Sequence, residues 1–461
     1  MNRARSSLLV SGLFLVLGCG ARPPDRLNLV LVSLDTCRAD RLACYGGDPS
    51  ITPALARFAR EAVVFGDCLS QSGLTAPSHM SLFTGHYVHR YGLFNNRGGI
   101  DPPYTLASVL RDAGWRTAAF TGNGSLTEKQ GAASGFQLFE SWVGEPAWPF
   151  TRDLEEVVPR GLAWIDRESD GDPFFLFLHA YDPHAPYWPG EETRQRFAGW
   201  YEGDFDPRRL THPNEFARLL KRGEIGADEL RYVNDLYDGE LAEADRVFGE
   251  LLDGLRERGL LDTSIVIFTS DHGESLGEHG WVGHSTVWEE ILHVPLLVRF
   301  PGGRHAGDVG APVQLVDLFP TLCAALGIAP PAGLQGRDLT PLVTGERAGE
   351  TERMRLARVG AKKNQVALRF DDRWKLVFSE AKKEGIGGLH LYDLTSDRAE
   401  SRNLARTAEG RERSADMLAR YRRFREATRA DDRRFASTPR EGEPSPEDEA
   451  TLRALGYVGG D

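Results

Sequence analysis

The chain of 461 residues is long enough for one large α/β domain with a smaller one attached, and its hydrophobic content of 41% is ordinary for a globular protein with a buried core. This composition excludes a disordered chain. The formal net charge of −12 argues against nonspecific binding to nucleic acid, which requires clustered lysine and arginine, so we expect no nucleic-acid partner.

The first residues have the features of an export signal. Arg3 and Arg5 precede an apolar run that ends at Gly18 and Cys19. The run is too short to span a bilayer comfortably, and its order of charged, apolar and small residues is typical of a cleaved signal peptide. We expect residues 1–19 to be this signal and Cys19 to become lipidated, which would anchor the protein to a membrane, facing the periplasm or the cell exterior. An ordinary secreted signal with an incidental cysteine is the alternative.

Four further cysteines follow without any close pair among them: Cys37, Cys44, Cys68 and Cys323. An oxidising compartment would permit disulfides, but the sequence does not pair these residues. Zinc sites built from cysteine use closely spaced pairs, so we expect no zinc site among these cysteines.

Three short apolar runs predict strands that are buried on both faces of a parallel sheet. They are residues 27–34, followed by Asp35; residues 174–178, followed by His179; and residues 264–270, followed by Asp271. All three runs therefore end at a polar residue that can bind a metal ion. Ligand sites in open α/β sheets lie at the carboxyl ends of the strands, so this pattern predicts a site at that edge.

Two segments between the strands have different compositions. Apolar residues recur at helical spacing from Leu241 to Leu255, which predicts an amphipathic helix packed on the sheet. Residues 189–229 are richer in charge and weakly periodic. We expect this second segment to be a surface insertion beside the site, with an influence on substrate choice.

The character of the sequence changes near its last quarter. Residues 365–370 and 374–378 flank a polar turn and predict a β-hairpin, and residues 391–394 predict a further strand. The stretch from Met417 to Phe424 predicts a charged helix with one apolar stripe. We therefore expect a C-terminal subdomain over residues 346–461, with antiparallel strands and a charged helical tail.

One short motif carries the strongest functional signal. The stretch from Thr75 to His79, Thr-Ala-Pro-Ser-His, followed by Thr84 and Gly85, resembles the sulfatase signature Cys-x-Pro-Ser-Arg with Thr-Gly a few residues later. Further sulfatase-like motifs occur in the expected order, at residues 33–40, 270–280 and 288–296. The chain thus resembles the sulfatase family of the alkaline phosphatase superfamily. The resemblance implies a large mixed, mostly parallel sheet sandwiched by helices over residues 20–345, with a small C-terminal α+β subdomain.

The same resemblance implies a metal-dependent ester hydrolase and a set of metal ligands. Asp35, Asp271 and His272 match ligands of the family, and Thr75 matches the nucleophile. Thr36 stands where many sulfatases have a second ligating aspartate, so Thr36 and the Thr75 hydroxyl complete the set of candidate metal ligands, and the metal shell is one carboxylate poorer. We expect one divalent ion, manganese, zinc or calcium, and fewer carboxylates favour a transition-type ion over calcium.

A second metal ion is a weaker hypothesis. Asp182, His184 and His284 are the candidates for its ligands, but their spacing does not match the Asp-x-x-x-His run of two-metal nucleotide phosphodiesterases.

Thr75 decides the expected chemistry. In sulfatases, the cysteine at this position is oxidised to formylglycine, and threonine cannot yield that aldehyde. Nucleotide phosphodiesterases and lipoteichoic acid synthases of the same superfamily use threonine directly. A bound cation can lower the pKa of an oxygen ligand by many units. Pro77 follows Thr75 in what resembles a helix start, where backbone dipoles favour negative charge, although a simple N-cap is the structural alternative.

Four further polar residues match or adjoin substrate contacts of the family. His284 stands where a lysine holds the ester oxygens, so its imidazole is expected to hold such an oxygen or to protonate a leaving group. His184 matches a histidine on the substrate side, and Asn123 falls near lysine and histidine contacts. His79 stands at the arginine position and is expected to hydrogen-bond the nucleophile or to cap the helix. For each residue a purely structural role is the alternative.

The expected reaction is displacement at phosphorus through a phospho-Thr75 intermediate, which water or an acceptor alcohol then resolves. The substrates would be phosphate diesters, phosphate monoesters or phosphonates of a small molecule, glycan or lipid. Sulfatase activity is the alternative, because a sulfothreonine lacks the exit that the formylglycine hydrate provides. A catalytically silent binding lipoprotein is the third hypothesis, and the joint presence of Asp35, Thr75, Asp271 and His272 argues against it.

Overall fold

The structure of the protein is a computed structural model that describes residues 26–122, 125–141, 153–168, 171–210, 215–346, 353–360, 364–380, 388–435 and 438–439. The expected signal segment, residues 1–19, and Asn123 lie outside the described residues. Among the described residues, no helix combines the length and the apolar character that a membrane crossing would require. The thiols of Cys37, Cys44, Cys68 and Cys323 are all free.

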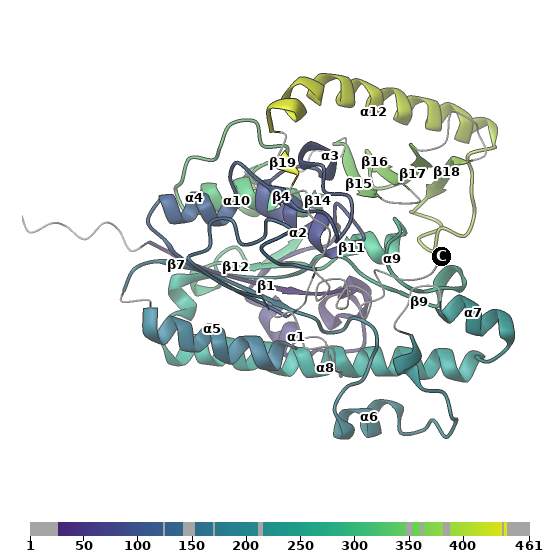
Figure 1. The fold of residues 1–461 in the computed structure, drawn as a ribbon, viewed down its shortest axis with the longest axis horizontal. Coiled ribbons are helices and arrows are strands. Elements are labelled where there is room, and N and C mark those ends of the chain that lie inside the picture. The colour runs from purple at the N-terminus through teal and green to yellow at the C-terminus, as the bar shows by residue number, and fades with distance from the viewer. Residues whose placement is uncertain are drawn as a thin grey trace, which may run out of the picture.

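An eight-stranded sheet forms the centre of the larger domain, in the order β13-β2-β12-β8-β1-β7-β5-β6 (Figure 1). Its strands are β1 (Asn28–Leu34), β2 (Val63–Phe65), β5 (Arg116–Thr121), β6 (Leu138–Ser141), β7 (Phe174–Ala180), β8 (Ser264–Ser270), β12 (Leu296–Arg299) and β13 (Gly307–Val309). β12 pairs antiparallel with both of its neighbours, and every other pair in the sheet is parallel. The expectation of a mixed, mostly parallel sheet is confirmed.

The three predicted strands lie side by side at the middle of this sheet. Every residue of β1, β7 and β8 is buried, which explains why the sequence shows continuous apolar runs rather than alternation. β8 has the predicted bounds, and β1 begins one residue later than predicted. β7 continues through His179 to Ala180, so His179 belongs to the strand rather than following it.

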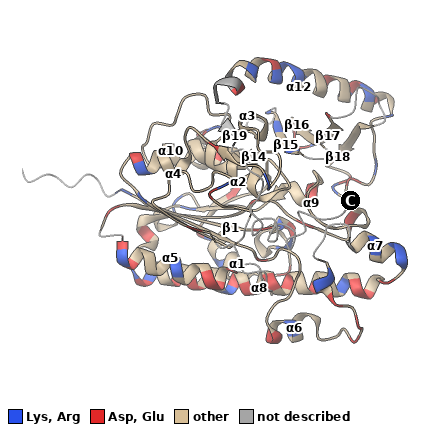
Figure 2. Cartoon of the chain, viewed as in Figure 1, with Lys and Arg blue, Asp and Glu red and all other residues tan. Residues whose placement is uncertain are grey.

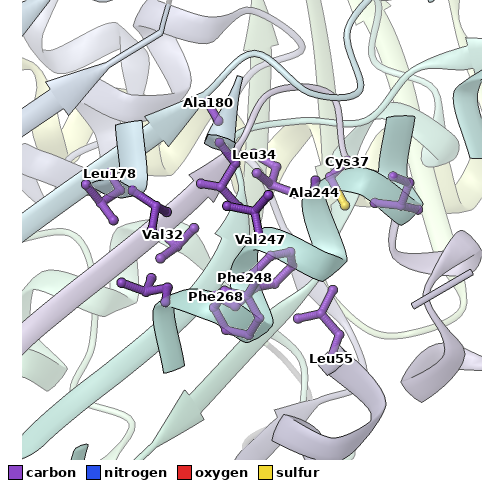
Figure 3. Close-up of a cluster of buried hydrophobic side chains, with 14 of the residues drawn as sticks. Val32, Leu34, Cys37, Leu55, Leu178, Ala180, Ala244, Val247, Phe248 and Phe268 are labelled. Carbon is purple, nitrogen blue, oxygen red and sulfur yellow. The ribbon is translucent and has the colours of Figure 1, made fainter. Parts of the chain in front are cut away.

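Helices cover both faces of the sheet and form two separate cores (Figure 1). On one face lie α1 (Pro53–Ala59), α5 (Leu154–Glu168) and α8 (Ala227–Glu257), and on the other lie α2 (Thr75–Thr84), α4 (Leu106–Asp112) and α10 (Leu318–Ala325). Figure 3 shows the first core, where Val32 and Leu34 of β1 meet Val247 and Phe248 of α8. Charged side chains lie along α5 and α8, whereas the central strands are nearly free of them (Figure 2).

The insertion at residues 189–229 is more regular than its weak periodicity predicted. It contains α6 (Glu191–Ala198), a 3-10 turn at Pro207–Arg209, α7 (Glu215–Arg222) and the first residues of α8. The amphipathic helix predicted from Leu241 to Leu255 is therefore the second half of a 31-residue helix. Pro189 packs against Gly239 of α8, so tertiary contacts order a segment whose own pattern is weak.

The C-terminal subdomain is a four-stranded antiparallel sheet covered by one long helix (Figure 1). The strands are β15 (Arg355–Val359), β16 (Gln365–Arg369), β17 (Trp374–Ser379) and β18 (His390–Asp393), and the helix is α12 (Ala408–Phe435). The predicted hairpin is β16 and β17, the further strand is β18, and the predicted charged helix is α12. Met417 and Tyr421 of α12 pack on Leu368 and Leu376 of the sheet.

The remaining short elements connect these parts. They are β3 (Cys68–Leu69), α3 (Val88–Tyr91), β4 (Ile100–Asp101), β9 (Ser275–Leu276), β10 (Val282–Gly283), α9 (Glu289–Leu292), β11 (His293–Val294), β14 (Val313–Gln314), α11 (Thr340–Val343) and β19 (Thr438–Pro439), with 3-10 turns at Ala39–Arg41, Ala43–Tyr45, Leu261–Thr263, Glu278–Gly280, Pro301–Gly303 and Leu315–Asp317.

Candidate active site

The carboxyl ends of the central strands bring the predicted polar residues together. Leu34 of β1 pairs with Ser270 of β8, so the residues that follow these strands, Asp35 and Asp271, are neighbours. His179 pairs with Ser33 on the other side of β1. All three polar residues are buried. The shared edge that the sequence predicted therefore exists.

Asp35, Asp271 and His272 form a cluster whose ligand atoms all lie within 4.8 Å of one another. His272 Nε2 lies 3.8 Å from Asp35 Oδ1 and 3.5 Å from Asp271 Oδ2. His272 Nδ1 donates to the Gly273 carbonyl at 3.0 Å, so Nε2 keeps its lone pair. Among the described residues, neither His272 Nε2 nor Asp271 Oδ2 has a hydrogen-bond partner. Burying a polar atom without a hydrogen-bond partner costs free energy, and a divalent cation bound by these atoms would remove that cost. Two carboxylates and one imidazole are suitable ligands for such a cation.

The electrostatics of the cluster agree with that fit. Burial raises the pKa of Asp271 to about 6, although His79 opposes the rise. Burial also lowers the pKa of His272 to about 4. A cation stabilises both a carboxylate and a neutral imidazole, so it would hold these two side chains in their ligating forms.

Thr75 is the first residue of α2, and its hydroxyl faces this cluster. Its Oγ1 donates to Asp35 Oδ2 at 3.3 Å. Leu74, in an extended conformation, is the N-cap residue of the helix, so the N-cap role considered for Thr75 is wrong. All ten residues of α2 are buried. Thr75 thus has a fixed position at a helix N-terminus, where anions are favoured. Its hydroxyl is hydrogen-bonded to Asp35, a carboxylate of the candidate metal-binding cluster.

His79 lies one helical turn after Thr75 and supports the cluster from the protein interior. Its Nδ1 donates to the Thr75 carbonyl at 2.9 Å, and its Nε2 lies 3.0 Å from Ser33 Oγ. Nδ1 is also 3.7 Å from Asp271 Oδ2. Because the carbonyl fixes the proton on Nδ1, Nε2 accepts from Ser33. His79 also forms a second group with His179 and Asp271, whose ligand atoms lie within 4.8 Å of one another. His79 therefore contacts the backbone of Thr75 and is not a helix cap.

His184 and His284 were both predicted as site residues, and they form a pair. Their Nε2 atoms lie 3.0 Å apart. His184 Nδ1 donates to the Ala185 carbonyl at 2.5 Å, and His284 Nδ1 donates to the Gly73 carbonyl at 3.2 Å. The His284 ring lies 4.6 Å from that of His272, measured between centroids. Burial lowers the pKa of both paired histidines well below the usual value.

Thr36 adopts an unusual backbone conformation beside the cluster. Its φ of 58° lies in the left-handed region, which costs a β-branched residue about 1–3 kcal/mol. This conformation directs the Thr36 amide to Asp271 Oδ1 at 3.3 Å, while its carbonyl accepts from Tyr237 at 2.9 Å. The residue thus orients Asp271 through its backbone.

Two residues at the site were not assigned a catalytic or ligating role from the sequence, although His179 was noted as a polar residue at a strand end. His179 Nε2 lies 3.8 Å from Asp35 Oδ2, and its position at a strand end was the only signal for it. Asn96 accepts from the Ala76 amide at 3.0 Å through Oδ1. Its side chain is only 2% exposed, and its Nδ2 has no hydrogen-bond partner among the described residues. Nothing in the local sequence distinguishes Asn96 from an ordinary turn residue.

Two family models match the chain. One, described as Sulfatase, matches residues 27–328, and the other, described as N-sulphoglucosamine sulphohydrolase, C-terminal, matches residues 277–427. Arylsulfatase K of Gallus gallus is 28% identical over 459 residues, which cover 86% of this chain and 84% of that protein. An N-acetylglucosamine-6-O-sulfatase of Bacteroides thetaiotaomicron is 25% identical over 435 residues, covering 75% of this chain and 76% of that protein.

Solved structures with the same fold include two with different named chemistry. One, solved in complex with its substrate D-glucosamine-2-N,6-O-disulfate, has a TM-score of 0.73 and 21% identity, covering 87% of this chain and 98% of that chain. The phosphonate monoester hydrolase of Agrobacterium radiobacter has a TM-score of 0.70 and 22% identity, covering 88% of this chain and 96% of that chain.

Proposed function

The chain belongs to the sulfatase family of metal-dependent ester hydrolases, and within this family we propose that it cleaves phosphoric or phosphonic esters with Thr75 as the nucleophile. The observation that carries the proposal is the Thr75 hydroxyl at the start of α2, 3.3 Å from Asp35 Oδ2. This position supports the proposal, because a cation bound at Asp35 and the helix dipole would together activate a hydroxyl there.

One divalent ion would be held by Asp35, Asp271, His272 and the Thr75 hydroxyl. When bound, such an ion lowers the pKa of a ligating hydroxyl and stabilises negative charge on the ester. Two carboxylates and one imidazole suit manganese or zinc, and calcium is the less favoured choice because Thr36 offers no carboxylate.

The residues of the chain then divide the reaction among them. While the bond from Thr75 Oγ1 to phosphorus forms and the bond from phosphorus to the leaving oxygen breaks, the neutral Nε2 atoms of the His184 and His284 pair accept the Thr75 proton and pass it to the leaving oxygen. Asn96 Nδ2 donates to an oxygen of the phosphoryl group. Water or an acceptor alcohol then attacks phosphorus, its proton returns to the histidine pair, and Thr75 is released.

Sulfatase activity is the second candidate function, and the named relatives favour it. Arylsulfatase K and the N-acetylglucosamine-6-O-sulfatase both carry sulfatase names. The chemistry of Thr75 opposes it, since a sulfated threonine has no hydrate whose collapse would expel sulfate. A catalytically silent binding protein is a poorer candidate still, because it would not require the buried acidic and imidazole cluster described above.

A parallel assay separates these possibilities. Purified protein loaded with manganese or zinc is given an aryl phosphodiester, an aryl phosphonate and an aryl sulfate, and kcat/KM is measured for wild type and for Thr75→Ala. Thr84→Ala is the matched control, because Thr84 is a buried threonine at the other end of the same helix, where it donates to the Met80 carbonyl at 2.6 Å. We expect the phosphorus esters to be preferred and Thr75→Ala alone to lose roughly 1000-fold or more of that activity. Preference for the sulfate, or a fully active Thr75→Ala, would overturn the proposal.

The N-terminal sequence and one structural neighbour suggest the location of the protein and the class of its substrate. The sequence of residues 1–19 supports export and a lipid anchor at Cys19, so the substrate would be met outside the cytoplasm. One structural neighbour was solved with a sulfated glucosamine as its substrate, which makes a glycan ester a reasonable first class to screen. Lipid esters are the second class, because a membrane anchor would hold the site near them.

A further inference from the structure

Five buried charged side chains and one that is partly exposed, Asp67, meet between the larger domain and the C-terminal sheet. Asp67 and Glu289 come from the larger domain, and Arg355, Arg369, Lys375 and Glu400 come from the subdomain. Their formal charges balance. Figure 1 shows why they meet, since α9, which begins with Glu289, lies next to the subdomain sheet.

Lys375 is at the centre of this network and is 0% exposed. Its Nζ lies 3.2 Å from Glu289 Oε2 and 3.0 Å from Glu400 Oε1. Burial alone would raise the pKa of Glu289, but Arg369 and Lys375 lower it to about 2. Burying each ion costs several kcal/mol, and an apolar contact would join two domains at lower cost. The network therefore points to a requirement for exact placement.

The segment that the network holds leads directly to His284. The Glu289 amide donates to Glu400 Oε2 at 2.5 Å, which fixes the backbone as well as the side chain. At the other end of the same loop, the Gly73 carbonyl accepts from His284 Nδ1 at 3.2 Å and from the Ser285 amide at 3.0 Å. The loop from His284 to Glu289 is thus attached at both ends, with the histidine at one and the ion pair at the other.

The loop from His284 to Glu289 has little conformational freedom between these two attachments. A Cβ atom on Gly73 would lie 2.4 Å from the Thr286 carbonyl oxygen, so the two backbones are already in close contact. Ser285 is held in the left-handed region at a φ of 74°. The subdomain also holds the loop that leads to the nucleophile, because the Arg358 amide of β15 donates to the Gln71 carbonyl at 2.8 Å. A shift at Glu289 would therefore move His284 relative to Thr75.

We propose that Lys375 is a positioning residue, which holds Glu289 and through it sets the place of the His284 imidazole against His184. The C-terminal sheet then contributes to the site through Lys375, Glu289 and the loop that carries His284. This inference rests on the proposed role of His284 in the reaction.

The test is a double-mutant cycle with Lys375→Met, His284→Ala and the combined variant, assayed on the best ester substrate. We expect Lys375→Met to lower kcat by about 10-fold to 100-fold, as a displacement of about 1 Å can, with KM and bound metal per chain little changed. In the His284→Ala background, Lys375→Met should cost almost nothing more, because the group that it positions is gone. A purely structural role would give losses that multiply.

Two further variants keep the test decisive. Arg299→Met is the control, since Arg299 is also a buried cation, paired at 3.0 Å to Glu61 and 2.8 Å to Asp262, whose side chains are exposed, in a network that shares no residue with the His284 loop. If Lys375→Met does not fold, Glu289→Gln, which keeps the shape of the side chain, replaces it in the cycle. Multiplying losses, or an equal loss of kcat in Arg299→Met, would overturn the proposal. A fully active His284→Ala would instead refute the proposed role of His284, whereas an inactive His284→Ala beside a fully active Lys375→Met would refute the positioning alone.

Discussion

Replacing Gly73 by alanine tests a close backbone contact between two loops of the site. The added methyl would lie 2.4 Å from the Thr286 carbonyl oxygen and 2.8 Å from Ile291 Cγ2, and real contacts of this kind begin at about 3.0 Å. The Thr286 carbonyl oxygen is a backbone atom, so the added methyl would displace the whole loop around Thr286 and not only a side chain. Such overpacking costs about 1–3 kcal/mol of stability. The Gly73 carbonyl would no longer hold His284 in place, and a displacement of about 1 Å reduces activity by about 100-fold.

Urea unfolding and steady-state kinetics measure the two effects of Gly73→Ala separately. Gly66→Ala is the control, because the nearest atom to its added methyl is the Val309 carbonyl oxygen at an ordinary 3.8 Å. We expect Gly73→Ala to lose far more kcat than its loss of stability would explain, and the control to stay near wild type. If the two variants have the same kcat, the close approach of the two loops does not set the position of His284.

Two further predictions concern charge. Burial alone would raise the pKa of Asp67, but Arg369 and Arg355 lower it well below its usual range, so the stability that it contributes is complete above the unfolded pKa of about 3.9 and is lost as the pH falls below that value. Urea unfolding at neutral pH and at roughly pH 3 should show a larger loss for wild type than for Asp67→Asn, and equal losses would contradict the ion network. Thr36→Asp restores a carboxylate beside Asp35 in a left-handed conformation that aspartate tolerates, and it should tighten calcium binding roughly tenfold by titration calorimetry. Unchanged calcium affinity would show that the side chain at this position does not reach the ion.

The sequence predicted the parts of the site that local pattern encodes. Asp35 and Asp271 each follow a mainly apolar strand that is fully buried, and parallel strands with helical crossovers carry such residues to one edge. Thr75 was identified by its neighbours in the chain, Pro77 and the Thr-Gly pair. These signals are local, because strand burial and helix starts depend on a few consecutive residues.

Residues whose role depends on contacts distant in the chain could not be predicted. Asn96 is at the site because its side-chain Oδ1 accepts a hydrogen bond from the Ala76 amide, and no local sequence pattern predicts this contact. His179 was placed just after a strand, but a strand buried on both faces shows no periodicity that marks its last residue. The first half of α8 was not predicted, although Val233, Leu236 and Tyr237 form a buried apolar stripe there and the helix also packs on α6.

The balanced ions between the two sheets have a consequence for how this protein could be divided. Cutting the chain near residue 346 would leave Asp67 and Glu289 as uncompensated acids on one fragment and a surplus of cations around Lys375 on the other. The two parts differ in architecture on either side of this boundary, but we expect that neither would fold stably without the other. We expect a C-terminal part taken from another family member to fold onto this chain only if it carries cations that pair with Asp67 and Glu289.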